Sequence, residues 1–212
     1  MKLIVIILVF ISSFTYSQIY ELRGADTAIL NRIQNYRKSL HIKPASVDSI
    51  IHSTQIEKLK WMSSRKMVTH GGPLNVMAEF GNKLIKKYAS VDSSYFSGSG
   101  YECIYITQVR LPFSDTANAV AIIQSRFLKM IADSAVYGWA HSPEHNDIIL
   151  TQEFADESPL LKNFPSNIRM YACATFNLQH SYIMPSSGYK SYYVTVLFNN
   201  IRGNAKKIKN KL

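Results

Sequence analysis

The chain has 212 residues, of which 47% are hydrophobic and 12% aromatic, and its formal net charge is +10 at pH 7. This length fits one domain, which can bury an ordinary core without covalent staples. The two cysteines, Cys103 and Cys173, are too few for a disulfide-dense scaffold. The positive charge occurs without a recognisable nucleic-acid motif, so we expect no nucleic-acid partner.

Residues 1–17 have the pattern of a secretory signal peptide. Lys2 gives a positive start, an apolar run follows from Leu3 to Ile11, and Thr15-Tyr16-Ser17 forms a small-x-small cleavage site. The apolar run is much shorter than the ~20 residues that span a bilayer, so we expect no transmembrane segment. We expect cleavage near Ser17-Gln18 and a secreted or periplasmic protein; an uncleaved anchor is the alternative.

The first half of the mature chain predicts helices. Residues 26–40 carry apolar side chains at helical spacing, and Pro44 disfavours a helix just before it. Asp48 is a candidate N-cap for a second helix that runs to about Met67. After Gly71-Gly72-Pro73, an apolar stripe over residues 74–88 predicts a third helix.

The second half predicts strands around another helix. After a polar loop at 90–100, residues 101–109 are β-branched and aromatic and predict a strand. Ser114 or Asp115 is expected to cap a long helix to about Ile131, with further turns toward Trp139. Residues 170–178 alternate in the manner of a strand, and a last strand is expected over 192–199. The predicted fold class is α+β, as a three-layer α-β-α sandwich.

The segment W-A-H-S-P-E-H-N-D-I-I-L at residues 139–150 resembles the W-x-x-S-P-G-H-R-x-N-I-L signature of bacterial CAP (SCP-like) domains. Six further segments resemble motifs of that family in the same order. They are L-N-R-I-Q-N-Y-R at 30–37, K-P at 43–44 with Asp48, M-V-T-H-G-G at 67–72, G-Y-E-C-I at 100–104, Y-A-C-A-T-F at 171–176 and Y-Y-V-T at 192–195. The resemblance implies one CAP domain over residues 18–200, followed by a tail at 201–212.

In that family, two histidines and acidic residues line a central cleft, and the resemblance places His70, Glu102 and His145 there. Two imidazoles with a carboxylate suit a divalent metal such as Zn²⁺, with His70 and His145 as ligands; the same three side chains could instead hydrogen-bond a polar ligand. The family glycine before the second histidine is Glu144 here. Glu144 and Asp133 are the candidates for a further acid.

Each candidate also has a simpler interpretation. His70 alone could interact with the C-terminal end of a helix, where a cation is favourable, and His145 and Glu102 could be solvent-facing. His141 precedes His145 by four residues, but Pro143 argues against one helix carrying both. Ser142 lies near His145, yet the chain has no G-x-S-x-G nucleophile motif, so we expect no nucleophilic catalysis.

Two functions follow from the resemblance. The first is a non-enzymatic module that binds a small molecule or lipid at or outside the cell envelope, with no cofactor required. The second is a divalent-metal-dependent hydrolase in which His70 and His145 bind the metal and Glu102 is a ligand or base. The sequence leaves open whether the protein is an enzyme, and the oligomeric state is likewise open.

Two features lie outside the cleft. Export permits a disulfide between Cys103 and Cys173; two buried free thiols are the alternative. The tail carries five cations, which suit attraction to an anionic envelope surface: Arg202, Lys206, Lys207, Lys209 and Lys211.

Overall fold

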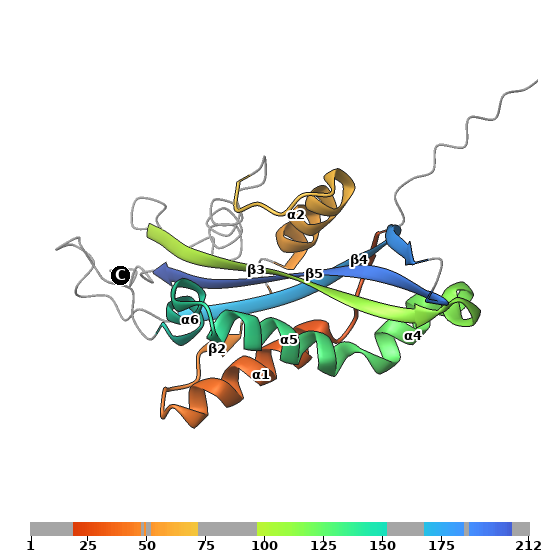
Figure 1. Cartoon of the computed structure of the whole chain (residues 1–212). Coiled ribbons are helices and arrows are strands. Elements are labelled where there is room, and N and C mark those ends of the chain that lie inside the picture. The colour runs from red at the N-terminus through yellow and green to blue at the C-terminus, as the bar shows by residue number, and fades with distance from the viewer. Residues whose placement is uncertain are drawn as a thin grey trace, which may run out of the picture.

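The computed structural model describes residues 19–47, 49, 52–71, 97–151, 168–184 and 187–204. The predicted signal peptide, the Asp48 cap and the predicted helix at 74–88 lie outside these residues. Where the chain is described, it has an α+β fold in which helices cover both faces of one sheet (Figure 1).

Within the described residues the sheet has five strands. Four follow the order β1-β4-β5-β3 in antiparallel pairs, and β2 runs parallel to β4. Its centre is formed by two long strands, β4 (Ile168–Met184) and β5 (Tyr189–Asn204). Strand β3 (Ser97–Pro112) pairs with β5 over its whole length. The short strands β1 (Ile19–Glu21) and β2 (Ser46–Val47) both pair with β4.

Of the α-helices in the described residues, four lie on one face of the sheet and α2 (His52–Arg65) lies on the other (Figure 1). The four are α1 (Ala25–Ser39), α4 (Ala119–Arg126), α5 (Leu128–Ala140) and α6 (Pro143–Leu150). The larger apolar core, which includes Trp139 and Phe198, fills the space between these helices and the sheet. A smaller core joins α2 to the opposite face through side chains such as Leu59 and Leu197. No helix in the described part of the chain is long and apolar enough to cross a bilayer.

The alternation predicted for residues 170–178 is confirmed. Ala172, Ala174 and Phe176 belong to the larger core, whereas Cys173 belongs to the smaller core beneath α2. Successive side chains of a strand point to opposite faces, and this pattern follows from one buried layer on each side.

The same alternation of side chains determines whether Cys103 and Cys173 can form a disulfide. Cys103 pairs in register with Phe198, and Cys173 pairs with Leu197, one residue earlier along β5. The two sulfurs therefore point to opposite faces of the sheet, Cys103 into the larger core and Cys173 into the smaller one. Both cysteines are free and buried, so of the two alternatives the structure has the free thiols.

Several predicted boundaries differ in the structure. A 3-10 helix, η3 (Phe113–Asn118), precedes α4, and neither Ser114 nor Asp115 caps an α-helix. The helical segment is interrupted at Phe127, which separates α4 from α5. Strand β5 continues to Asn204 because residues 201–204 pair with residues 97–100 of β3, so the sheet extends four residues beyond the expected domain end at residue 200.

Arg37, the last residue of the L-N-R-I-Q-N-Y-R motif, connects α1 to α6. Its side chain is 2% exposed and donates hydrogen bonds to the carbonyl oxygens of Lys43, Ile149 and Thr151. Two of these acceptors lie at the C-terminal end of α6, where the helix dipole favours a cation. Burial lowers the pKa of Arg37, and the carbonyl groups compensate for the water that the guanidinium has lost.

Candidate functional site

Glu102 lies on β3 and faces α2, where it forms an ion pair with Lys58. The Lys58 Nζ is 2.5 Å from the Glu102 Oε1, and the side chains are only 4% and 13% exposed. Asn199 lies opposite Glu102 in the register of β3 and β5, and its amide nitrogen is 3.5 Å from the Glu102 Oε2. Gln55 in turn donates a hydrogen bond of 2.7 Å to the Asn199 Oδ1. A buried polar network thus connects α2 to two strands of the sheet.

His70 lies against the same carboxylate. Its Nδ1 is 3.2 Å from the Glu102 Oε1, and its side chain is 62% exposed. The Lys58 ammonium also donates a hydrogen bond of 3.1 Å to the His70 carbonyl oxygen, which fixes the backbone here. Helix α2 ends at Arg65, five residues before His70, so the alternative of His70 as the C-cap of this helix is wrong. The structure brings His70 and Glu102 together, as the family resemblance implies.

Lys58 was not among the predicted site residues, although the sequence carries a signal for it. The buried face of α2 includes Gln55, Lys58, Leu59 and Met62, at helical spacings of three and four residues. A lysine at a core position of an amphipathic helix requires a buried partner. Such a position could have indicated an ion pair, but sequence alone does not say which carboxylate completes it.

His145 has a different partner. It lies in the first turn of α6, and its Nδ1 is 2.7 Å from the Ser142 Oγ. Its carbonyl oxygen lies 3.9 Å from the Cys103 Sγ, and Cys103 faces the sheet side opposite to α2. Among the described residues, His145 has no hydrogen bond or ion pair with His70 or Glu102, and no group of three or more His, Cys, Asp or Glu side chains could hold a metal ion.

The Ser142–His145 contact is local to the start of α6. Pro143 occupies the first turn of the helix, and α5 has already ended at Ala140, so His141 and His145 are not on one helix, as predicted. In the described part of the chain no carboxylate forms a hydrogen bond or an ion pair with His145. Among these residues the pair therefore has no third group of the kind that orients the base in a catalytic triad.

The two candidates for a further acid lie elsewhere. Glu144 is exposed in the first turn of α6, where a negative charge is favourable. Asp133 on α5 forms an ion pair of 3.0 Å with Arg32 on α1. Both α1 and α5 lie on the sheet face opposite to Glu102 (Figure 1), so Asp133 belongs to a different surface.

Other residues of the W-A-H-S-P-E-H-N segment fix α6 to the rest of the fold. Trp139 is 1% exposed in the larger core, and its Nε1 donates a hydrogen bond of 3.4 Å to the Ile104 carbonyl oxygen. Asn146, where the family has arginine, accepts a hydrogen bond of 3.0 Å from the Tyr36 hydroxyl. Asn200 donates a hydrogen bond of 2.9 Å to the Ile148 carbonyl oxygen. This motif therefore has a structural role in the described contacts.

No family model matches the chain, and no curated protein is similar to it. Among solved structures, an outer surface protein from Borrelia burgdorferi is similar, with 13% sequence identity and a TM-score of 0.43. The match covers 90% of this chain and 100% of that chain. Likeness at this level assigns neither a family nor a function.

Proposed function

We propose that the protein is an exported CAP-type domain, a three-layer α-β-α sandwich, that acts as a non-enzymatic ligand-binding module. The motifs at residues 30–37, 67–72, 100–104 and 139–150 support the family. The ligand site of this proposal is centred on His70 and Glu102, next to Lys58 of α2. The signal-like N-terminus supports a secreted or periplasmic location, and the basic tail supports attraction to an anionic envelope surface.

The observation that carries the proposal is the ion pair between Lys58 and Glu102. A carboxylate that already binds a buried ammonium is a poor ligand for a second cation, because the metal would have to displace the ammonium and leave it buried without a partner. The same ammonium competes for the lone pairs that a general base needs. The His70 Nδ1 has Glu102 within hydrogen-bonding distance, and the 62% exposed imidazole is available to a polar ligand.

The rival function, a zinc-dependent hydrolase, requires His70 and His145 to share a metal with Glu102. The donors fit zinc poorly, since the Glu102 Oε1 contacts Lys58 and the His145 Nδ1 contacts Ser142. The two proposals therefore differ in the response to metal.

Zinc titration separates them. We expect that ZnCl₂ leaves the melting temperature of the wild type unchanged and gives no saturable heat in isothermal titration calorimetry. A metal that binds only the folded chain would raise the melting temperature. His70→Ala is the matched variant: a rise in the wild type that this substitution abolishes would contradict the binding-module proposal. A rise that persists in His70→Ala would place the metal elsewhere on the chain.

A further inference from the structure

A long polar groove runs between helices α1 and α5, on the sheet face opposite to α2. The two helices lie side by side and pack against each other (Figure 1). Two hollows of about 500 Å³ and 290 Å³ follow them, and both are lined by Arg32 and Asn35. Together they form one groove, here called the α1–α5 groove, that extends from Lys129 near the start of α5 to His141 just after its end. This stretch of helix covers about 18 Å, which is long enough for an extended ligand.

Arginine and lysine outnumber acidic residues in the α1–α5 groove. The described lining has Arg32, Arg126 and Lys129 against a single carboxylate, that of Asp133. Asp133 forms its ion pair with Arg32, at 3.0 Å. Within the described part of the chain Arg126 and Lys129 form no ion pair, and both are exposed. Their charges are therefore available to an anion from outside the chain.

The position of Lys129 is unfavourable for the free protein. It lies in the first turn of α5, where the helix dipole is positive, and that turn has no acidic residue. Arg126, in the last turn of α4, lines the same end of the groove. An anion bound by both side chains would offset this repulsion, so the two positions suit a complex with an anionic ligand.

The other end of the α1–α5 groove carries two stacked rings. Tyr137 is 65% exposed, and the centre of its ring lies 3.9 Å from that of His141. The His141 Nδ1 donates a hydrogen bond of 2.8 Å to the Tyr137 carbonyl oxygen, which leaves the Nε2 of the neutral ring as an acceptor. The stacking holds the Tyr137 ring in one orientation while most of its surface stays open to solvent. Such a ring offers a flat apolar face beside polar groups.

Amide and hydroxyl side chains line the groove from one end to the other. Asn31, Asn35 and Ser39 are exposed on α1, and Ser125 is exposed on α4. An asparagine amide both donates and accepts hydrogen bonds, and a hydroxyl does the same. A chain of hydroxyl-bearing units could therefore bind along the groove and keep its polar groups hydrogen-bonded.

We propose that the α1–α5 groove binds an acidic polysaccharide, a chain of pyranose units that carry carboxylate groups. One carboxylate would pair with Arg126 and Lys129, and a pyranose ring would stack its C–H face on Tyr137. Hydroxyl groups between these points would bond to Asn31 and Asn35. An acidic peptide supplies the charge without the hydroxyl-rich rings, and a neutral polysaccharide supplies the rings without the charge.

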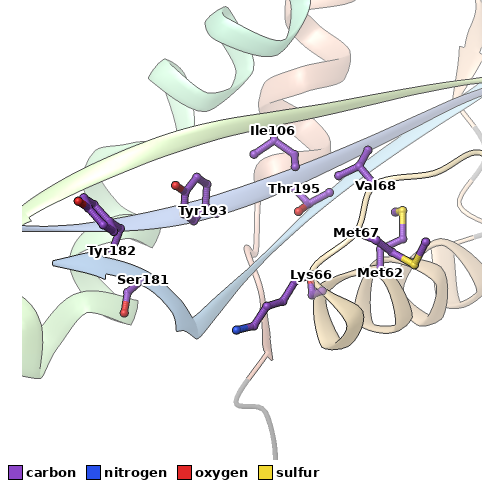
Figure 2. A pocket seen from close by; sticks show the side chains of 10 residues that line it. Met62, Lys66, Met67, Val68, Ile106, Ser181, Tyr182, Tyr193 and Thr195 are labelled. Carbon is purple, nitrogen blue, oxygen red and sulfur yellow. The ribbon is translucent and has the colours of Figure 1, made fainter.

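The hollow on the opposite face of the sheet has a different character (Figure 2). It lies beyond the end of α2, it has a volume of about 390 Å³, and its described lining is mainly apolar and aromatic, with Lys66 as the only charged residue. Lys66 and the exposed Lys60 of α2 therefore provide a charge-matched control away from the α1–α5 groove. Neither His70 nor Glu102 lines the α1–α5 groove, so the inference goes beyond the proposed function and does not depend on it.

Isothermal titration calorimetry with a β-1,4-linked mannuronate hexamer tests the proposal on the mature chain. β-1,4-Mannohexaose has the same backbone without the carboxylates, and hexaglutamate has the carboxylates without the sugar rings. We expect saturable binding of the mannuronate hexamer at one site, and binding of both other compounds that is weaker by about tenfold or more.

The cationic end is tested by the double variant Arg126→Gln/Lys129→Gln. It should weaken mannuronate binding about tenfold, as the loss of two exposed ion pairs allows, and leave mannohexaose unchanged. Lys60→Gln/Lys66→Gln loses the same charge on the other face of the sheet and should bind the mannuronate hexamer like the wild type. This control accounts for the general attraction between a basic protein and a polyanion.

The aromatic end is tested by Tyr137→Ala, which should weaken mannuronate binding about fivefold. Tyr137→Phe keeps the ring and should bind like the wild type. Because the side chain is exposed, both variants should fold, which their melting temperatures check. His70→Ala should leave mannuronate binding unchanged, which separates this inference from the proposed function. The absence of saturable mannuronate binding, an equal affinity for hexaglutamate or for mannohexaose, or wild-type binding by Arg126→Gln/Lys129→Gln or by Tyr137→Ala would each overturn the proposal.

Discussion

Lys58 and Glu102 form the most consequential contact of the described site. Both side chains are nearly buried, and the ion pair is supplemented by bonds to the His70 carbonyl oxygen and to Asn199. Burial of two charges is costly, and the pair is tolerated because each charge has hydrogen-bonding partners as well as the opposite charge. The arrangement fixes the segment that carries His70 against the sheet.

Removal of one member of this pair should be more harmful than removal of both. Lys58→Met should lower the free energy of unfolding by about 3 kcal/mol, since it leaves a carboxylate buried without its counter-ion. The double variant Lys58→Met/Glu102→Leu should recover most of that loss. Urea denaturation of the wild type, both single variants and the double variant measures the coupling. Equal losses in the single and double variants would show that the two charges do not interact.

The cysteines illustrate how one residue of register changes chemistry. The side chains of Cys103 and Cys173 lie on opposite faces of the sheet, each in a different core. Burial raises the pKa of both thiols and keeps them protonated. A buried protonated thiol is a poor nucleophile. The structure therefore places Cys103 in the larger core and Cys173 in the smaller one.

We expect two thiols per chain to react with Ellman's reagent after unfolding without reductant, and almost none in the folded protein.

Because the folded-state pKa values of both thiols are raised, the stability that the protonated thiols contribute is fully present below about pH 8.5, the ordinary pKa of a thiol. It is lost as the pH rises above that value. Thiol titration at pH 8 with and without denaturant provides the measurement. An unfolded, unreduced chain without reactive thiols would contradict the assigned strand faces.

At the level of elements, α5 depends on a close approach to β3. A Cβ added at Gly138 would overlap the Cε2 of Tyr105, whose ring also lies edge-on to Trp139. The missing side chain at residue 138 therefore allows the Tyr105 ring to pack beneath the helix.

Gly138→Ala should destabilise the protein by about 1–3 kcal/mol, the usual range for overpacking, because the ring must move. The pair Tyr105→Ala/Gly138→Ala should show a smaller loss from the added methyl group than Gly138→Ala does in the wild-type background. Thermal and urea unfolding of the wild type, Gly138→Ala, Tyr105→Ala and the double variant measures this difference. Ala135→Ser, at another buried position of α5, would show the cost of a substitution that leaves the Tyr105 contact intact. If the alanine costs the same with and without the tyrosine ring, the close approach is not the cause.

The whole molecule has an uneven distribution of charge, with four lysines in residues 205–212. Those residues lie outside the described part of the chain, and β5 ends before them at Asn204. A stop after residue 204 preserves every described strand pair, whereas a stop after residue 200 would remove the pairing between residues 201–204 and β3.

Truncation after Asn204 should therefore leave the melting temperature nearly unchanged and weaken binding to anionic vesicles at low salt. Each cation near an anionic surface contributes about 1 kcal/mol, and added salt should reverse the attraction. Co-sedimentation with vesicles of anionic and of neutral lipid measures the effect. Unchanged binding after truncation would exclude the tail as the anionic-surface contact, and a large loss of stability would indicate that the tail is part of the folded domain.

The sequence by itself determined the features that depend on local periodicity and turn chemistry. The apolar spacing of residues 26–40 placed α1, and the alternation of 170–178 placed both faces of β4. Pro143 indicated the boundary between α5 and α6, because a proline is favoured in the first turn of a helix and disfavoured in its interior. The motifs also indicated that His70 and Glu102 would meet.

Only the tertiary structure decided the partners of those residues. Lys58 reaches Glu102 across 44 positions because α2 lies over β3 at that register, and helical spacing alone does not fix where a helix lies on a sheet. His145 contacts Ser142, and the two cysteines face opposite layers, for a related reason: the relative register of β3, β4 and β5 determines which face each side chain shares. The register of the strands depends on the packing of both cores at once. A local sequence pattern does not show which distant segments will be in contact.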